Sequence, residues 1–458
     1  MTDVHTARTG FDRRLLPVMM LGSILNPVNS TIIAVALIPI GIALGAPPAQ
    51  TAWLVSSLYL ATALGQPVVG RLIDLFGPRR LFLAATSLVG VAGLIGTMAP
   101  NLVVLIVSRV VLGFGTCAGY PAAMALLRSE ARRTGQDSPA GVLTALAIAN
   151  QTIAVIGPLL GGALIAVGGW RATFVVNVPL AIAAVLLGLR LPKQDSGDLV
   201  RTGLVKRLDL PGMGLFAAML LSLLLFLMNL HLATWYLFVI AVAAGTAFAV
   251  RELRAETPFI DLRVLGGNTP LVATYGRALV AYTVSYAFLY GFTQWTEEGF
   301  GLSPFAAGLV QIPMFAVAIG ISFLTGRRKG VRGKLLLGGA GQIVACVLML
   351  TLTAASPLWL LIALALVFGI PQGTNSLALQ NSVYFQADPE RTASSAGLLR
   401  TFGYLGSMVA SAATAASFGQ RASTGGMHEL AWIMLAAGIL YLAITVFDRS
   451  IGRFGSSS

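Results

Sequence analysis

The segment GRLIDLFGPRR, Gly70–Arg80, joins two long apolar runs through a short turn that holds three arginines and one aspartate. A second basic turn, GRRKGVRGK at Gly326–Lys334, joins two further apolar runs. Because the two turns stand at matching places in two series of apolar runs, they indicate an internal repeat. Three further pairs recur at nearly the same separation along the chain: Pro100 and Pro357, Gly113 and Gly369, and Gly141 and Gly397.

The composition predicts that lipid surrounds much of this chain. Of its 458 residues, 56% are hydrophobic and only 10% are charged, whereas soluble domains contain about 25% charged residues. A helix needs about 20 apolar residues to cross a bilayer, and the alternation expected of a membrane barrel is missing. The predicted fold class is therefore an all-α membrane protein with fourteen transmembrane helices. These stretches are Leu15–Ala43, Trp53–Leu72, Leu81–Met98, Leu102–Leu127, Gly141–Val167, Thr173–Leu189, Leu210–Met228, Ala233–Val250, Pro270–Gln294, Ala306–Leu324, Leu335–Ala354, Leu358–Gln380, Ala393–Ser417 and Leu430–Val446.

The charge of +13 is distributed unevenly over the connections. If the N-terminus lies inside, the outer loops hold only Arg171 and Arg421 of the 30 Lys and Arg residues, and three more lie within the stretches: Arg109, Arg277 and Arg400. Nearly all other basic residues then face the cytoplasm, which predicts a multi-pass membrane protein with both termini cytoplasmic. The same distribution explains the basic charge without nucleic acid as a partner. The usage rich in arginine, alanine and glycine indicates a bacterium, so the expected location is the bacterial inner membrane.

The repeat divides the chain into three parts. Residues 1–189 are predicted to form an N-terminal six-helix bundle, residues 190–269 to hold cytoplasmic linkers with two extra transmembrane helices, and residues 270–458 to form a C-terminal six-helix bundle. Two similar bundles are typical of secondary transporters, whose substrate site lies between them near the membrane midplane. We expect a monomer that contacts membrane lipids and binds a small molecule.

The turn at Gly70–Arg80 predicts a gate. Asp74 lies among Arg71, Arg79 and Arg80, and a carboxylate beside several cations can pair in one conformation and separate in another. The alternative is an ordinary basic cytoplasmic loop.

Several motifs resemble those of the major facilitator superfamily. Gly70–Arg80 resembles its cytoplasmic signature, and the resemblance implies the major facilitator fold with alternating access. Other motifs resemble its fourteen-helix drug:proton antiporter branch, which implies export of lipophilic or amphipathic compounds, as in multidrug or antibiotic efflux. These are GWRATFVVNVP at Gly169–Pro179, DLPG at Asp209–Gly212 and SPFAAG at Ser303–Gly308. Arg109 in SRVVLGFG resembles the fourth-helix arginine motif of the superfamily, and GPLLGG at Gly157–Gly162 resembles the fifth-helix motif typical of its antiporters.

Arg109 and the glycine-rich motif are also informative without the resemblance. A charge inside a membrane helix costs roughly 2.5–3.5 kcal/mol on insertion scales, so Arg109 is expected to face protein or water and to serve coupling or gating. The alternative is an arginine bonded to neighbouring carbonyls. Pro158 bends a helix, and glycine lets another helix approach closely. The helix-bend residues are Gly157, Pro158, Gly161 and Gly162.

Asn29 departs from the resemblance. The run NSTIIAVAL, Asn29–Leu37, resembles the branch's first-helix motif, which usually has Asp where Asn29 stands. An amide cannot titrate, so either a peripheral acid carries the proton, or transport is uncoupled, or Asn29 replaces a natural acid. Glu297 and Glu298 lie at the outer end of the ninth stretch. Asn29 alternatively serves only a helix–helix hydrogen bond.

Polar side chains within the apolar stretches are expected to face an interior cavity, because lipid offers them no partners. Tyrosines present an apolar face with a polar end, which suits flat substrates. Ordinary helix packing is the alternative for the tyrosines. The predicted cavity residues are Asn29, Tyr59, Gln151, Tyr286, Tyr290, Gln294, Gln372 and Asn375.

The sequence indicates neither an enzyme nor a cofactor. The histidines stand in tails or loops, so no metal site is indicated, and no phosphate-binding Gly-x-x-x-x-Gly-Lys run occurs. The resemblance to the antiporter branch implies an exporter coupled to protons, which is the predicted function. The alternatives are an uncoupled or facilitative metabolite carrier, a lipid exporter, and a membrane receptor or scaffold.

Overall fold

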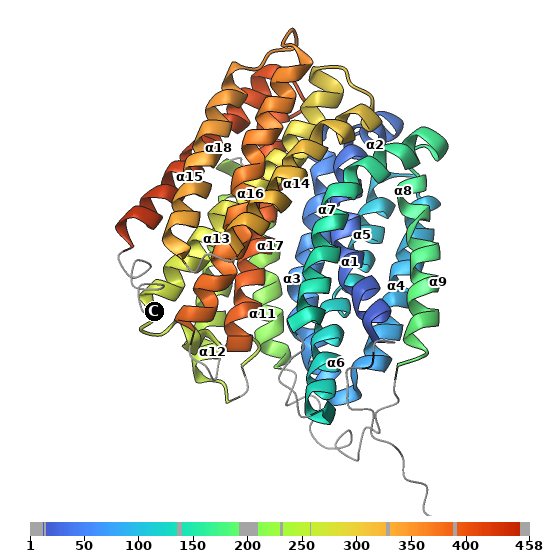
Figure 1. Ribbon diagram of the computed structural model, residues 1–458, viewed down its shortest axis with the longest axis vertical. Helices are drawn as coiled ribbons and strands as arrows, with labels where there is room; N and C mark the ends of the chain where they lie inside the picture. The colour runs from blue at the N-terminus through green and yellow to red at the C-terminus, as the bar shows by residue number, and fades with distance from the viewer. Residues whose placement is uncertain are drawn as a thin grey trace, which may run out of the picture.

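The computed structural model describes residues 12, 15–134, 140–191, 209–229, 232–256, 258–326, 330–387 and 392–448. Every regular element in these ranges is a helix. The helices form two groups that stand side by side, with the N-terminal half at the right of Figure 1 and the C-terminal half at the left.

The N-terminal half opens with a broken helix, because a 3-10 turn interrupts the first apolar run. Its elements are α1 (Leu16–Ile32), η2 (Ile33–Val35), α2 (Leu37–Leu44), α3 (Pro48–Phe76), α4 (Pro78–Thr97), α5 (Leu102–Thr116), α6 (Gly119–Thr134), α7 (Ala140–Gly168), α8 (Ala172–Val175) and α9 (Asn177–Gly188).

The C-terminal half follows an inserted pair of helices. The insertion holds α11 (Leu210–Met228), η4 (Leu232–Thr234), α12 (Trp235–Arg254) and η5 (Leu262–Leu265). The half itself holds α13 (Thr269–Ala287), η6 (Phe288–Phe292), η7 (Trp295–Gly299), α14 (Pro304–Gly326), α15 (Val331–Thr351), α16 (Leu358–Gln386), α17 (Thr392–Phe418) and α18 (Thr424–Phe447).

The count of fourteen membrane helices is not confirmed. Within the described residues, ten helices are long and apolar enough to cross a membrane. The stretch expected at Thr173–Leu189 consists of the short helices α8 and α9, and the stretch at Pro270–Gln294 passes from α13 into π-helical turns. Sequence hydropathy does not reveal such breaks, because the residues at a break are as apolar as those in an unbroken helix.

The two halves meet along two helix pairs, α3 with α17 and α7 with α14. At one end two hydrogen bonds join the halves: the Ala49 amide donates to the Gly419 carbonyl at 3.0 Å, and the Ser411 hydroxyl donates to the Ala52 carbonyl at 2.8 Å. We call this end, where α3 begins and α17 finishes, the outer end. The halves are therefore joined directly at the outer end.

The inserted pair is anchored by the motif DLPG. Asp209 caps α11 by accepting from the Gly212 amide at 3.1 Å, and it also accepts from Arg251 of α12 at 2.6 Å and from the Phe259 amide at 3.2 Å. Glu252 accepts from the Ile260 amide at 2.8 Å. One carboxylate thus ties the start of α11 to the end of α12, while α11 packs against α17 and α3.

Candidate functional site

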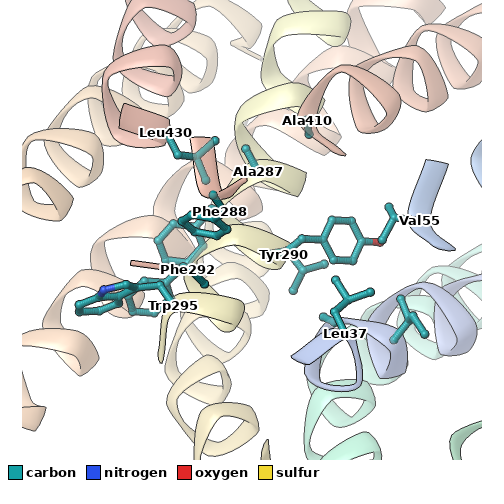
Figure 2. Packing of buried hydrophobic residues seen from close by; sticks show 14 of the residues in the cluster. Leu37, Val55, Ala287, Phe288, Tyr290, Phe292, Trp295, Ala410 and Leu430 are labelled. Atoms are coloured by element: carbon teal, nitrogen blue, oxygen red, sulfur yellow. The ribbon is translucent and has the colours of Figure 1, made fainter. Parts of the chain in front are cut away.

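A cluster of tyrosines lies where the two halves touch. The Tyr290 hydroxyl of η6 donates to the Ser30 carbonyl of α1 at 3.0 Å. The Tyr59 hydroxyl of α3 lies 3.0 Å from the Tyr290 hydroxyl, and since Tyr290 has already used its proton, Tyr59 is the donor in this pair. Figure 2 shows the Tyr290 side chain extending from the C-terminal half toward Val55.

Further aromatic rings pack around these hydroxyls. Tyr286 meets Tyr59 edge-on at 5.2 Å between ring centroids and stacks on Tyr290 at 5.8 Å. Tyr404 of α17 lies 6.0 Å from Tyr59. We call Tyr59, Tyr286, Tyr290 and Tyr404 the tyrosine cluster. Its rings offer flat apolar faces, and its hydroxyls are the polar ends that a bound aromatic compound would meet.

The end of α1 supplies the acceptors for this site. The last four carbonyls of an α-helix have no partner within the helix, and because α1 ends at Ile32 these include the carbonyls of Asn29 and Ser30. Arg109 Nη1 donates to the Asn29 carbonyl at 3.3 Å, next to the carbonyl that binds Tyr290. Two successive carbonyls of the broken helix therefore hold Arg109 and Tyr290.

Arg109 is buried among backbone groups. Its Nε donates to the Leu54 carbonyl at 2.9 Å, and only 1% of the residue is exposed. In the part of the chain that the structure describes, no carboxylate forms an ion pair with Arg109, and its Nη2 has no hydrogen-bond partner. The negative end of the α1 dipole faces the guanidinium instead. Arg109 is therefore bonded to neighbouring carbonyls, which is the second of the two arrangements that the sequence left open.

Asn29 points away from the tyrosine cluster. Its amide donates to the Asn177 side chain of α9 at 2.7 Å and to the Leu25 carbonyl at 2.9 Å. The side chain therefore joins two helices of the same half, which is the alternative given for it from sequence. Asn177 belongs to the motif Gly169–Pro179, but its role as the partner of Asn29 had no signal in the sequence.

The amides of the C-terminal half are spread over three places. Gln294 donates to the Tyr290 carbonyl at 3.2 Å. Gln372 accepts from Ser285 of α13 at 2.7 Å, beside the tyrosines. Asn375 accepts from Tyr441 of α18 at 2.9 Å, so it lies inside the C-terminal bundle and does not join the others.

The motif GPLLGG makes α7 a close neighbour of two helices. A Cβ on Gly157 would collide with the Thr31 hydroxyl of α1, and one on Gly162 would lie 2.5 Å from Phe305 Cα of α14. Gly161 faces the Ile32 carbonyl, and the Pro158 carbonyl lies 2.7 Å from where a Cβ on Gly308 would stand. Gly157 and Gly161 therefore allow the contact with α1, whereas Gly162 and Gly308 allow the contact between the halves.

The predicted gate and Gln151 are described only in part. Arg71 and Asp74 stand on the last turns of α3 and Gln151 stands on α7, but their side chains lie outside the described residues. Arg79 and Arg80 lie in the first turn of α4. The pairing of Asp74 with these arginines stays a prediction.

The open chamber expected between the halves is not seen at the tyrosine cluster. Tyr59 and Tyr290 are each 1% exposed, so their rings fill the space between α1, α3 and α13. One hollow, of about 280 Å³, lies at the outer end and is bordered by Thr51, Glu298 and Gln420. A larger hollow runs along α12, past Thr246 and Arg251. Both lie away from the cluster, in which Tyr286 and Tyr404 are half-buried.

Two polar contacts had no clear signal in the sequence. Arg277 is buried and bonded to Asp448 at 2.8 Å. Arg400 of α17 stacks on the Tyr120 ring of α6 at 3.6 Å, which adds a further contact across the halves. Within the described residues, no group of three or more potential metal-binding side chains forms a metal site.

Comparison with known proteins decides the family. The sequence profile of the Major Facilitator Superfamily matches residues 19–411. The chain belongs to this superfamily. Its fold is shared by the nucleoside transporter NupG, whose crystal structure superposes with a TM-score of 0.62 at 12% sequence identity over 94% of this chain and 100% of that one.

Three relatives in the superfamily align with nearly their whole length. The uncharacterized MFS-type transporter YwoD of Bacillus subtilis is 33% identical over 93% of this chain and 94% of its own. The lincomycin resistance protein of Streptomyces lincolnensis is 29% identical over 93% and 90%. The riboflavin transporter RibZ of Clostridioides difficile is 26% identical over 94% and 95%. The chain is thus a membrane transporter of this superfamily.

Proposed function

We propose that this transporter exports small lipophilic or amphipathic compounds, antibiotics and drugs among them, in exchange for protons. It is assigned to the fourteen-helix drug:proton antiporter branch, as a monomer in the bacterial inner membrane with both termini in the cytoplasm. The observation that carries the proposal is the tyrosine cluster, where Tyr59 and Tyr290 bring flat apolar rings from both halves to one place. The relative named a lincomycin resistance protein supports a drug as the substrate.

The transport cycle follows from the contacts between the halves. The outer end is closed by two hydrogen bonds between the halves, from Ala49 to Gly419 and from Ser411 to Ala52. If the halves rock apart there, these bonds break, and the rings of Tyr59 and Tyr290 separate. A compound that reached the cluster from the cytoplasmic side then leaves through the outer end.

A second function, facilitated passage of a metabolite, is favoured by one contact. Asn29 and Asn177 form a neutral pair where the branch usually has an acid, so the first helix offers no proton carrier. The relative named a riboflavin transporter also carries a flat aromatic compound of metabolism.

Flux in proteoliposomes tests both functions. Purified protein is reconstituted, and accumulation of ethidium, lincomycin and riboflavin is measured with and without an imposed pH gradient, against protein-free vesicles. Export predicts that the gradient drives ethidium or lincomycin. Riboflavin counterflow that ignores the gradient, with no drug flux, would replace export by the second function.

A further inference from the structure

The outer half of the helix that carries the tyrosines has an unusual backbone. After α13, two π-helical segments follow within twelve residues, η6 at Phe288–Phe292 and η7 at Trp295–Gly299. π-Helical turns are rare and are often found at functional sites. Tyr290 lies in the first of them, where it makes the contact between the halves. The contact made by Tyr290 does not explain the second segment, at Trp295–Gly299.

The second π-helical segment buries a carboxyl group. Glu297 is 7% exposed, and among the described residues neither of its carboxyl oxygens has a hydrogen-bond partner. The described ion pairs place no cation beside it. An ionised carboxylate that is removed from water without a partner costs several kcal/mol, and such groups take up a proton instead.

The surroundings of Glu297 hold more acceptors than donors. One turn earlier, the Thr293 hydroxyl donates to the Leu289 carbonyl and accepts from Gln311 of α14 at 2.9 Å. The side-chain oxygens of Gln311 and Gln294 are both buried without a donor in the described part of the chain. A proton on Glu297 would add a donor to a region in which two side-chain oxygens have none.

Few ionisable groups stand on the elements around Glu297. Of the elements that pack against η7, α14 contains no ionisable side chain, and η6 contains only Tyr290. On α18, His428 bonds to the Leu352 carbonyl at 2.8 Å and Glu429 is exposed. Arg421, in the preceding loop, lies 3.5 Å from Glu298.

A hollow at the outer end is bordered by the residue that follows Glu297. Glu298 borders the hollow of about 280 Å³ at the outer end and accepts from the Ala422 amide at 2.9 Å. Thr51 borders the same hollow from the N-terminal half. Because the hollow lies between the halves, movement of the halves changes its width and the access of water to η7.

We propose that Glu297 is the proton-binding site through which this transporter couples export to the pH gradient. The site takes up its proton from outside when the outer end is open, and it holds the proton, shielded from water, while the outer end is closed as described here. When a compound binds at the tyrosine cluster from the cytoplasmic side, the proton leaves toward that side, along the polar groups of Thr293, Gln294 and Tyr290. Glu297 replaces the titratable group that Asn29 does not provide. The inference rests on the proposed function, because it assumes that the outer end opens during transport.

Glu297→Gln tests the site, with Glu429→Gln as the matched control. Both variants neutralise one glutamate at the outer end, but Glu429 is exposed. Ethidium flux in proteoliposomes is measured twice, once driven by a pH gradient and once as counterflow without a gradient. We expect Glu297→Gln to lose stimulation by the gradient and to keep counterflow, and Glu429→Gln to keep both. The infrared band of a protonated buried carboxyl should be present in the unmodified protein and absent from Glu297→Gln.

The outcomes separate this site from the function. Stimulation by the gradient that survives in Glu297→Gln overturns the site and leaves export standing, and so does a sodium gradient that replaces the pH gradient in driving the unmodified protein. Loss of both fluxes in a Glu297→Gln protein that still elutes as a single species, with the carboxyl band unchanged, assigns Glu297 a structural role and also overturns the site. If the unmodified protein moves none of the probes in either assay, the proposed function fails.

Discussion

The Tyr290 hydroxyl lies 3.0 Å from the Tyr59 hydroxyl and 3.0 Å from the Ser30 carbonyl, so one side chain of the C-terminal half holds two helices of the N-terminal half. The Ser30 carbonyl is free to accept because α1 ends two residues later. The break in α1 and the first π-helical segment therefore meet at one hydrogen-bonded point. That point is where the two halves must part if the transporter changes conformation.

Tyr290→Phe removes the donor to Ser30 and leaves the ring in place. A hydrogen bond of this kind contributes about 0.5–1.5 kcal/mol, so the closed state should lose a few-fold in population relative to the open state. Spin labels at Gln50 and Gln420, both exposed at the outer end, report that balance. Unchanged distance populations in Tyr290→Phe would show that the contact does not hold the halves together.

Gly162→Ala should prevent closure at the outer end. Its Cβ would lie 2.5 Å from Phe305 Cα, where backbone must move. We expect loss of ethidium flux and a shift of the labelled population toward the open state. Gly320→Ala is the control, because a Cβ there meets nothing within 4 Å. Equal flux in the two variants would contradict the account of the contact between α7 and α14.

Arg109→Ala leaves the Leu54 carbonyl and the end of α1 without their donor. An unsatisfied buried acceptor costs about 1–3 kcal/mol, so we expect lower thermal stability and loss of flux. Arg109→Lys should restore little, because an ammonium cannot span the two carbonyls as a guanidinium does. Flux across a broad panel of probes that equals that of the unmodified protein would remove Arg109 from coupling and gating.

Asn29→Asp introduces the acid that the resembling motif usually carries. If an acid there supports coupling, the variant should show a steeper dependence of ethidium flux on the pH gradient than the unmodified protein. The same measurement on Asn29→Leu separates charge from the lost bond to Asn177. A pH dependence that is the same in all three proteins would exclude this position from coupling.

Asp209 should make stability depend on acidity. Burial raises the pKa of Asp209, but its hydrogen bonds with Glu252, Arg251 and the Gly212 amide outweigh burial and leave the pKa below its usual value. The contribution of Asp209 to the free energy of unfolding is therefore complete above the ordinary pKa of about 3.9. It is lost as the pH falls through the lowered pKa of the folded protein.

Asp209→Asn should lower the free energy of unfolding by about 1 kcal/mol at neutral pH. This is less than hydrogen bonds to charged groups usually contribute, because the Arg251 side chain is 40% exposed and solvent screens its charge. Thermal unfolding in detergent between pH 3 and 7 measures both effects, with exposed Glu256→Gln as the control. A melting temperature that falls equally with acid in all three proteins would contradict this role.

The repeat of basic turns and the tyrosine spacing were the informative parts of the sequence. Tyr286 and Tyr290, four residues apart, were predicted to share a site with Tyr59, and the structure places all three together. The sequence left two roles open for Asn29, because pattern alone does not say which neighbouring helix its amide meets. The surroundings of Asn375 could not be read from the sequence for the same reason, because its partner Tyr441 stands far along the chain. The π-helical turns around Glu297 have no sequence pattern that hydropathy could detect.

The distance between the two halves at the outer end tests the central claim most directly. Spin labels at Gln50 and Gln420 flank the bond between the Ala49 amide and the Gly419 carbonyl. In transporting protein, the account predicts two distance populations, one matching the closed contact and one longer, whose proportions change when ethidium or a pH change is applied. A single short distance under every condition in which the protein transports would contradict it.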